Sequence, residues 1–441
     1  MALFRDIPAP GPDEPTSVYI DWASRRDPTG HRVHLVLGML ALFLIPLAST
    51  PATIGSTLLF GYTLLRAPTL WRTWLAFPRT PALIAVFALF VWLACSTSWS
   101  TDPEKGIRLL RGSRYLLLIP ALVPLLAHRR LLLQALVAGI VLQCAAQFSG
   151  SWLGFDMNFG GFSEHGGHTG LWYSLPLGFL LFDPKSIPAG IVIRYVLFAA
   201  IALGLVATQA RSALAGAAGG LVIALVFERI FQIRRVAWGQ SVAILICLIG
   251  LLGIVSITPI GDRVTNAWDA MTTPYEGGRF NIDRTRPLWW RLGIENWYEQ
   301  PVLGAGLGSA ESIIGSDNPE IRAIIAENPQ NTSAARDDFH STFVTVLVES
   351  GLIGFLILVG WMALLLGSIL RNREMRLILL VGFIAWLGYS VFNTTLFSGR
   401  LVAFSCTLLA LSMVRDLNTN TGLMTSFKRA NSVTLENADG G

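Results

Sequence analysis

Hydrophobic positions along the chain gather into long apolar runs that short polar links separate. A helix needs roughly 20 apolar residues to cross the hydrocarbon core of a bilayer. Twelve runs approach that length, several of them short or divided only by proline or glycine: 34–49, 51–66, 81–97, 108–127, 131–149, 170–183, 187–208, 211–231, 236–259, 341–370, 376–396 and 398–414. The pattern predicts an all-α polytopic membrane protein with about twelve transmembrane helices.

The polar stretches divide the chain into five parts. We expect a cytoplasmic N-terminal segment, transmembrane helices 1–9, a large helical periplasmic loop, transmembrane helices 10–12 and a disordered cytoplasmic tail, at residues 1–33, 34–259, 260–340, 341–416 and 417–441. The first segment is polar and charged, so no cleavable signal peptide is expected. In the long loop, Pro287–Gln300 carries apolar residues at 290, 294, 297 and 298, which predicts a helix with one apolar face. That face could pack on the membrane domain or lie in the lipid interface.

The distribution of basic residues predicts how the chain is oriented in the membrane. Twelve spans place both termini on one side of the membrane, and most of the 33 Lys and Arg residues fall in the N-terminal segment, the tail and the links on that side. Short cytoplasmic links are enriched in Lys and Arg, so both termini are predicted to be cytoplasmic. The long loop then faces the periplasm.

Composition supports a membrane protein. Hydrophobic residues make up 53% of the 441 and charged residues 14%, against about 25% charged in a typical soluble domain. The formal charge of +5 indicates loops near anionic lipid rather than a nucleic-acid partner. The four cysteines lie far apart inside apolar runs, so we interpret them as small core hydrophobes with no disulfide and no zinc site: Cys95, Cys144, Cys247 and Cys406.

The last polar stretch before the final apolar runs carries the first candidate for chemistry. His340 follows Asp337-Asp338-Phe339 and precedes an apolar run that begins at Thr342. An imidazole at the mouth of a membrane helix can take up a proton near neutral pH. The positive end of the helix would keep it neutral, whereas the two aspartates would favour the charged form. The alternative is a histidine that only caps the helix or lies in a loop.

Arginines form the second set of candidates. Arg211 stands between two apolar runs, where an arginine is costly unless it snorkels or has an anionic partner. Arg286 and Arg291 open the predicted loop helix, and their plain interpretation is a solvated helix face. Arginine forks match phosphate oxygens bidentately, so the three could hold a lipid diphosphate.

A metal site is a weaker possibility. Glu164, His165 and His168 lie in a glycine-rich stretch, but no further ligand cluster accompanies them. The chain has no Asp-x-Asp pair, no phosphate-binding glycine loop and no dinucleotide-binding pattern. We therefore expect no metal and no cofactor. Arginines beside one histidine suggest instead a transfer in which the energy arrives with a lipid-diphosphate donor and the histidine takes the proton of an incoming hydroxyl.

Three segments carry a resemblance to a known family. His340-Ser341, nine residues, Gly351, two residues and Gly354 resembles the signature of the bacterial lipopolysaccharide O-antigen ligases. The segment from Arg286 to Gly306 is similar to an Arg–Trp–helix–Pro-x-x-Gly-x-Gly segment of the wider ligase and polymerase superfamily. Thr208-Gln-Ala-Arg211-Ser-Ala resembles its Thr-x-Ser-Arg-x-Ala segment, with Ala210 where serine is common.

The resemblance implies a GT-C-type membrane glycosyltransferase in the bacterial inner membrane, with its active site at the periplasmic face. It implies metal-independent, inverting transfer of O-antigen polysaccharide from undecaprenyl diphosphate to a sugar hydroxyl of lipid A–core. His340 would be the general base, and Arg211 and Arg286 would hold the diphosphate. Arg291, Asp338 and His168 are weaker substrate-site candidates.

Other functions fit parts of the pattern. An O-antigen polymerase uses the same donor, and the nine-residue spacing after His340 favours the ligase. A protein O-oligosaccharyltransferase usually carries a larger C-terminal periplasmic portion. A polar-lipid transporter or flippase should place charges near the bilayer midplane, whereas the charges of this chain gather at the outer boundary.

Overall fold

The computed structural model describes residues 16–74, 80–150, 161–162, 166–183, 190–208, 210–231, 282–327 and 335–413, with a few single residues between them. The predicted span 236–259, Cys247, Glu164, His165, the first part of the long loop and the tail 417–441 lie outside the described residues.

Every regular element among the described residues is a helix. The first half holds α1 (Thr16–Arg26), α2 (Pro28–Leu44), α3 (Ser49–Leu65), α4 (Ala67–Trp74), α5 (Pro81–Ser96), η2 (Thr97–Trp99), α6 (Pro103–Leu110), η3 (Arg111–Leu117), α7 (Leu118–Leu122), η4 (Val123–His128) and α8 (Arg129–Gly150). The second half holds α9 (Gly166–Phe182), α10 (Ile191–Ala207), α11 (Arg211–Phe231), α14 (Ile282–Glu299), α15 (Ala310–Ile314), α16 (Pro319–Glu327), α17 (Thr342–Arg371), α18 (Arg376–Phe392) and α19 (Gly399–Ser412).

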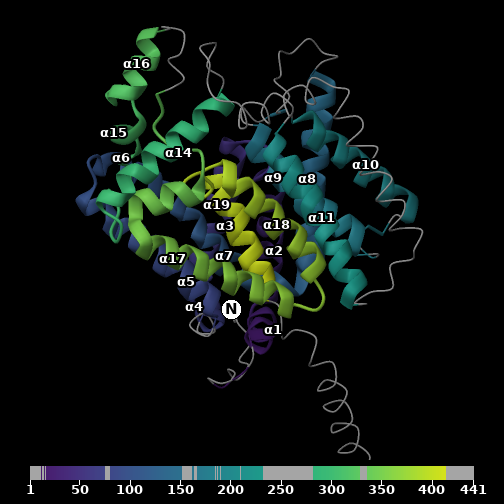
Figure 1. Ribbon diagram of the computed structural model, residues 1–441. Coiled ribbons are helices and arrows are strands. Elements are labelled where there is room, and N and C mark those ends of the chain that lie inside the picture. The colour runs from purple at the N-terminus through teal and green to yellow at the C-terminus, as the bar shows by residue number, and fades with distance from the viewer. Residues whose placement is uncertain are drawn as a thin grey trace, which may run out of the picture.

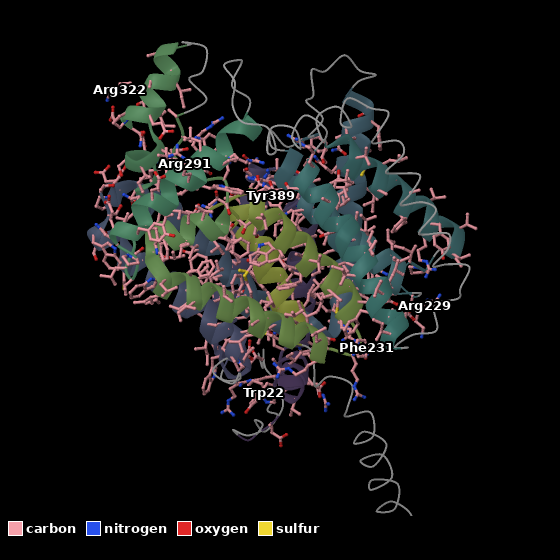
Figure 2. The ribbon with its side chains drawn as sticks, viewed as in Figure 1. Trp22, Arg229, Phe231, Arg291, Arg322 and Tyr389 are labelled. Atoms are coloured by element: carbon pink, nitrogen blue, oxygen red, sulfur yellow. The ribbon has the colours of Figure 1, made fainter. Side chains whose placement is uncertain are left out.

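The helices form one bundle. Helix α18 packs against α9, α11 and α17, and α17 packs against α5. Helices α14, α15 and α16 lie together at one end, and α1 lies at the opposite end (Figure 1). Arg291 and Arg322 lie toward the first end, and Trp22 and Arg229 toward the other (Figure 2).

Four helical stretches of the described chain are long and apolar enough to cross a membrane: Pro81–Trp99, Pro103–Ser149, Arg211–Phe231 and Thr342–Arg371. Three shorter apolar helices are Ile191–Ala207, Arg376–Phe392 and Gly399–Ser412. The helical membrane class is therefore confirmed, whereas the count of twelve spans and the GT-C architecture stay predictions.

One predicted span differs in form. The run 108–127 is a series of short turns, η3, α7 and η4, that leads into α8. Pro120 and Pro124 fall inside it, and each removes one backbone donor. A proline inside an α-helix kinks or breaks it, and short 3₁₀ turns are frequent connectors. The predicted apolar run is thus helical without being one regular helix.

Helix α17 is interrupted at Gly351, where φ is 69° and ψ is −171°. A break in a helix leaves carbonyl and amide groups without intrahelical partners. The segment Pro301–Gly306 fills this break. Ala305 N donates to Val348 O (2.9 Å), Gly306 N donates to Glu349 O (2.8 Å), and Leu352 N donates to Pro301 O (2.9 Å). From α5, Trp92 Nε1 donates to Ser350 O (2.9 Å).

Two glycines allow this close approach. A Cβ on Gly304 would lie 2.4 Å from Gly351 N, and a Cβ on Gly351 would lie 2.2 Å from Val302 O. Both residues have positive φ, which other residues rarely adopt. Gly304 belongs to the Pro-x-x-Gly-x-Gly segment and Gly351 to the Gly-x-x-Gly segment, so the two motifs are in direct contact.

Helix α14 packs on the rest of the protein. Trp289 is fully buried, Leu292 is 9% exposed, and Gly293 lies close enough to Phe339 that a Cβ would meet its ring at 2.8 Å. Tyr298, which the sequence placed on the apolar face, is 70% exposed. The buried face is therefore centred on 289, 292 and 293, about one position away from the face expected at 290, 294, 297 and 298.

The break in α17 generates a first prediction. Gly351→Ala should lower the midpoint of thermal unfolding in detergent, because the strained backbone alone costs about 1–3 kcal/mol and the new Cβ would also meet Val302 O. Gly360→Ala is the matched control in the same helix, with nothing within 4 Å of the new Cβ. It should leave the midpoint unchanged or raise it, because alanine favours the helix by roughly 1 kcal/mol. Equal midpoints for the two variants, read by tryptophan fluorescence, would contradict the interlock.

Candidate functional site

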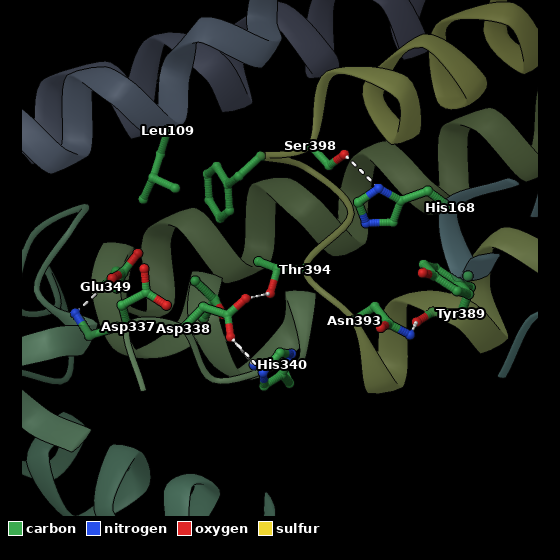
Figure 3. Close-up of a pocket in the computed structure, with 14 residues that line it drawn as sticks. Leu109, His168, Asp337, Asp338, His340, Glu349, Tyr389, Asn393, Thr394 and Ser398 are labelled. Carbon is green, nitrogen blue, oxygen red and sulfur yellow. Dashed lines mark hydrogen bonds and ion pairs between the residues drawn. The ribbon is translucent and has the colours of Figure 1, made fainter. Parts of the chain in front are cut away.

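A cavity of about 630 Å³ lies beside the N-terminal end of α17. It is bounded by the start of α9, the segment before α17, two turns of α17 and the link between α18 and α19 (Figure 3). Its lining includes Leu109, Gly167, His168, Ala310, Asp337, Asp338, His340, Thr345, Glu349, Tyr389, Asn393, Thr394, Phe397 and Ser398. Three of the six residues predicted for the site, His340, Asp338 and His168, therefore share one cavity.

His340 is held in an unusual conformation. Its φ of 48° is the one positive value at a non-glycine residue in the described chain. Such strain persists only where the surroundings impose it, and it is concentrated at functional sites. Asp338 Oδ1 lies 3.2 Å from His340 Nε2 and accepts from the His340 backbone N at 3.3 Å. Thr394 Oγ1 donates to Asp338 Oδ2 at 3.0 Å (Figure 3).

These contacts select one form of the neutral ring. A carboxylate only accepts hydrogen bonds, so its place 3.2 Å from Nε2 favours the neutral tautomer that carries its proton on Nε2. The lone pair is then on Nδ1, which is the atom left to take a proton. Asp338 acts here as an orienting group for His340.

Helix α14 also contacts His340 and the residue before it. The Trp289 and His340 rings lie 5.3 Å apart between centroids. Trp290 Nε1 donates to Phe339 O at 2.9 Å. The Trp-Trp pair that opens the second motif thus positions the histidine of the first.

Burial decides the direction of the pKa shift of His340. Burial lowers the pKa from its ordinary value of 6.5, because the charged ring loses hydration. Asp338 raises it, Arg286 and Arg336 lower it, and Asp337 raises it. The net direction is down, so the ring is the neutral, basic form at neutral pH. The competition between the helix end and the aspartates was open from sequence, and burial settles it.

The arginines of the two other motifs lie around this cavity. The Arg286 guanidinium is 5.9 Å from the centroid of the Phe392 ring and acts electrostatically on both His340 and Tyr389. Arg211 begins α11, and the hydroxyl of the next residue, Ser212, accepts from Asn393 Nδ2 at 3.0 Å. Neither arginine lines the cavity, but both belong to elements that contact its lining.

Asn393 connects two motifs. Its backbone carbonyl accepts from Thr342 N (3.1 Å) and Thr342 Oγ1 (2.8 Å) at the first turn of α17. Its side chain reaches Ser212 beside Arg211. All three sequence motifs therefore meet at the N-terminal end of α17.

The remaining candidates lie apart from His340. Arg291 is on the exposed side of α14, where it pairs with Glu295 at 3.2 Å and with Glu320. His168 Nδ1 lies 3.4 Å from Ser398 Oγ across the cavity. The described residues hold no group of three metal-ligating side chains, and His165 lies outside them, so the metal alternative is untested.

Sequence reasoning missed several residues of the cavity. Glu349 is the only charged residue in the apolar run 341–370, and a lone ionisable residue in a membrane segment is a functional signal. Asn393 and Thr394 interrupt the last apolar runs, which was a weaker signal. Arg400, 4% exposed in α19, acts electrostatically on the lining residue Tyr389, and as the one charged residue of the apolar run 398–414 it gave the same signal as Glu349.

The fold and the cavity define a helical membrane protein with a histidine, carboxylates and arginines at one end of its bundle. The family model described as O-antigen ligase matches residues 196–359, which include all three motifs. Over these residues the match supports the resemblance to the O-antigen ligase family. Members of that family are glycosyltransferase-like ligases or polymerases, with lipid-linked polysaccharide and lipid A–core as their general partners. No curated protein matches the chain.

The charges around His340 generate a second prediction. In histidine-labelled protein, the NMR titration midpoint of His340 should lie below pH 6.5. Arg336→Gln should raise the midpoint, because it removes a positive charge, and Asp338→Asn should lower it, because it removes a negative one. His340→Gln assigns the signal.

Arg322→Gln is the control, since this exposed arginine lies near Asp317 at the same end of the bundle. Its midpoint should equal that of the wild type. At pH values between 6.5 and the lower pKa of His340 in the folded protein, this side chain is protonated in the unfolded chain but neutral in the folded one. His340 therefore removes stability as the pH falls through that window. Shifts of the same sign in Arg336→Gln and Asp338→Asn would contradict the electrostatic account.

Proposed function

We propose that the chain is an O-antigen ligase of the bacterial inner membrane. It transfers polysaccharide from undecaprenyl diphosphate to a sugar hydroxyl of lipid A–core, at the periplasmic face and with both termini in the cytoplasm. One observation carries the proposal: the neutral His340 is held by Asp338 at the mouth of an apolar helix, within the field of Arg286. These are a base and a cation in the arrangement that a lipid-diphosphate donor requires.

The proposed reaction is a single displacement. The acceptor hydroxyl oxygen attacks the anomeric carbon of the donor, and its proton passes to Nδ1 of His340. The new glycosidic C–O bond forms as the bond between the anomeric carbon and the phosphate oxygen breaks. The electron pair leaves with undecaprenyl diphosphate, and attack opposite the leaving group inverts the anomeric centre.

The arginines would bear the charge of the leaving group. Arg286, with Arg211 beside the Ser212–Asn393 contact, would hold the diphosphate through guanidinium forks. No divalent ion is needed in this scheme, because fixed cations stabilise the charge where it develops. Asp338 would keep His340 oriented and stabilise the imidazolium after proton transfer.

The third prediction tests the base. Purified protein would be given lipid-linked O-antigen and rough lipopolysaccharide in EDTA, and capped lipopolysaccharide would be read on a gel. His340→Ala should lower the rate by roughly 10²- to 10⁴-fold, the usual contribution of a general base. His128→Ala, at the end of η4, should keep full activity.

The same assay separates the alternatives. Full activity of His340→Ala would end the general-base role. Lengthening of the lipid-linked chains without capping would identify a polymerase. Activity lost in EDTA and restored by a divalent ion would favour the His165 and His168 metal site. The absence of any transfer would favour a transporter.

The fourth prediction concerns the arginines. Arg286→Gln and Arg211→Gln should raise the KM for the donor more than the KM for the acceptor. Arg286→Lys should recover only part of the loss, because lysine keeps the charge but lacks the fork. Arg291→Lys is the control on the same helix, since Arg291 is engaged with Glu295 and Glu320. Equal effects of Arg286→Gln on donor and acceptor would argue against diphosphate binding.

A further inference from the structure

The cavity continues from His340 along α17. Thr345 and Glu349 both line it and stand four residues apart, which places them on one face of the helix. Thr345 is 2% exposed and Glu349 is 1% exposed. A volume of about 630 Å³ is within the range of small-molecule sites, so the space extends well beyond the His340 ring.

Both side chains present a polar atom that nothing in the described chain satisfies. Thr345 Oγ1 and Glu349 Oε2 are buried and have no hydrogen-bond partner among the described residues. Buried polar atoms in native proteins are almost always paired, and an exception calls for a ligand or another specific explanation. Two such atoms, one helical turn apart in one cavity, indicate a bound molecule with hydrogen-bond donors.

The Glu349 carboxylate is fixed in place. Oε1 accepts from the Ala310 backbone N at 3.0 Å (Figure 3). Lys105, 6% exposed, supplies positive charge near this end of the cavity, where its Nζ lies 3.6 Å from Asp337 Oδ2. These contacts hold one end of the carboxyl group, whereas Oε2 has no hydrogen-bond partner among the described residues.

The carboxylates that line this part of the cavity indicate which kind of ligand it would bind. Carboxylate oxygens accept hydrogen bonds, so they suit the hydroxyl groups of a sugar. Asp337, Asp338 and Glu349 together would repel a phosphorylated or acidic sugar. The guanidinium of Arg286, by contrast, acts on His340 and Tyr389, and it suits an anionic donor.

We propose that Thr345 and Glu349 form the acceptor subsite, which binds an uncharged sugar through two of its hydroxyls and presents a third to His340. The subsite rests on the proposed ligase reaction. Glu349 is thus a specificity-determining residue, and it favours acceptors whose receiving sugar carries no phosphate or carboxylate.

The experiment compares KM for the acceptor, KM for the donor and kcat in three variants. Glu349→Gln keeps the shape and loses the charge, and it should raise the acceptor KM by roughly 10- to 100-fold. Thr345→Val loses only the hydroxyl and should raise it by roughly 3- to 10-fold. The donor KM should stay within twofold in both.

Glu311→Gln is the matched control. This carboxylate contacts Lys105 at 3.3 Å but is 64% exposed and does not line the cavity. Its three constants should equal those of the wild type. Should Glu349→Gln fail to fold, Thr345→Val carries the test, because it removes a hydroxyl that has no partner in the described chain.

Binding is measured apart from turnover. In the His340→Ala background, rough lipopolysaccharide should raise the midpoint of thermal unfolding, and adding Glu349→Gln should abolish that rise. Loss of donor binding instead, or stabilisation by Mg²⁺ or Ca²⁺ alone that Glu349→Gln removes, would overturn the acceptor subsite. A wild type that transfers nothing would refute the ligase reaction, whereas an active wild type with an unchanged acceptor KM in both variants would refute only the subsite.

Discussion

The structure depends on how the backbone break in α17 is filled. Within an apolar helix, carbonyl and amide groups without partners are costly, so an interruption at Gly351 persists only if other groups take up the released hydrogen bonds. The segment Pro301–Gly306 and the indole of Trp92 do so. This pairing ties the part of the chain before α17 to the helix that His340 precedes. A requirement of backbone hydrogen bonding thereby fixes the geometry of the site.

The second constraint is the packing of α14 against the segment before α17. Trp289 stacks near the His340 ring, and Trp290 bonds to the preceding carbonyl. Asp338 then orients the imidazole, while burial lowers its pKa. The strained backbone of His340 is maintained by contacts on both sides. In the proposed reaction, a ring held in this way would lose little freedom on binding a substrate.

The cavity separates charge by position. Arg286 and Arg400 act electrostatically on Tyr389, whereas Glu349 bonds to Ala310 of α15 and Asp337 lies beside Lys105. Charges of both signs act on His340: Asp337 and Asp338 raise its pKa, whereas Arg286 and Arg336 lower it. Such an arrangement suits a reaction between an anionic donor and a neutral acceptor, because each substrate is attracted to one end and the wrong orientation is disfavoured.

The apolar runs, the helical class and the residue types of the three motifs could be read directly from the sequence. Hydropathy and spacing are local properties, and the observed helices follow the predicted runs closely at 81–97, 211–231 and 341–370. It also placed His340 just outside a membrane helix. Which polar residues share the cavity depends on how the folded helices pack. Asn393 and Ser212 meet across 181 residues of chain, and no local pattern encodes such a contact. The buried face of α14, the place of Glu349 in the cavity and the direction of the His340 pKa shift likewise depend on packing, because burial and the distance between charges exist only once the chain has folded.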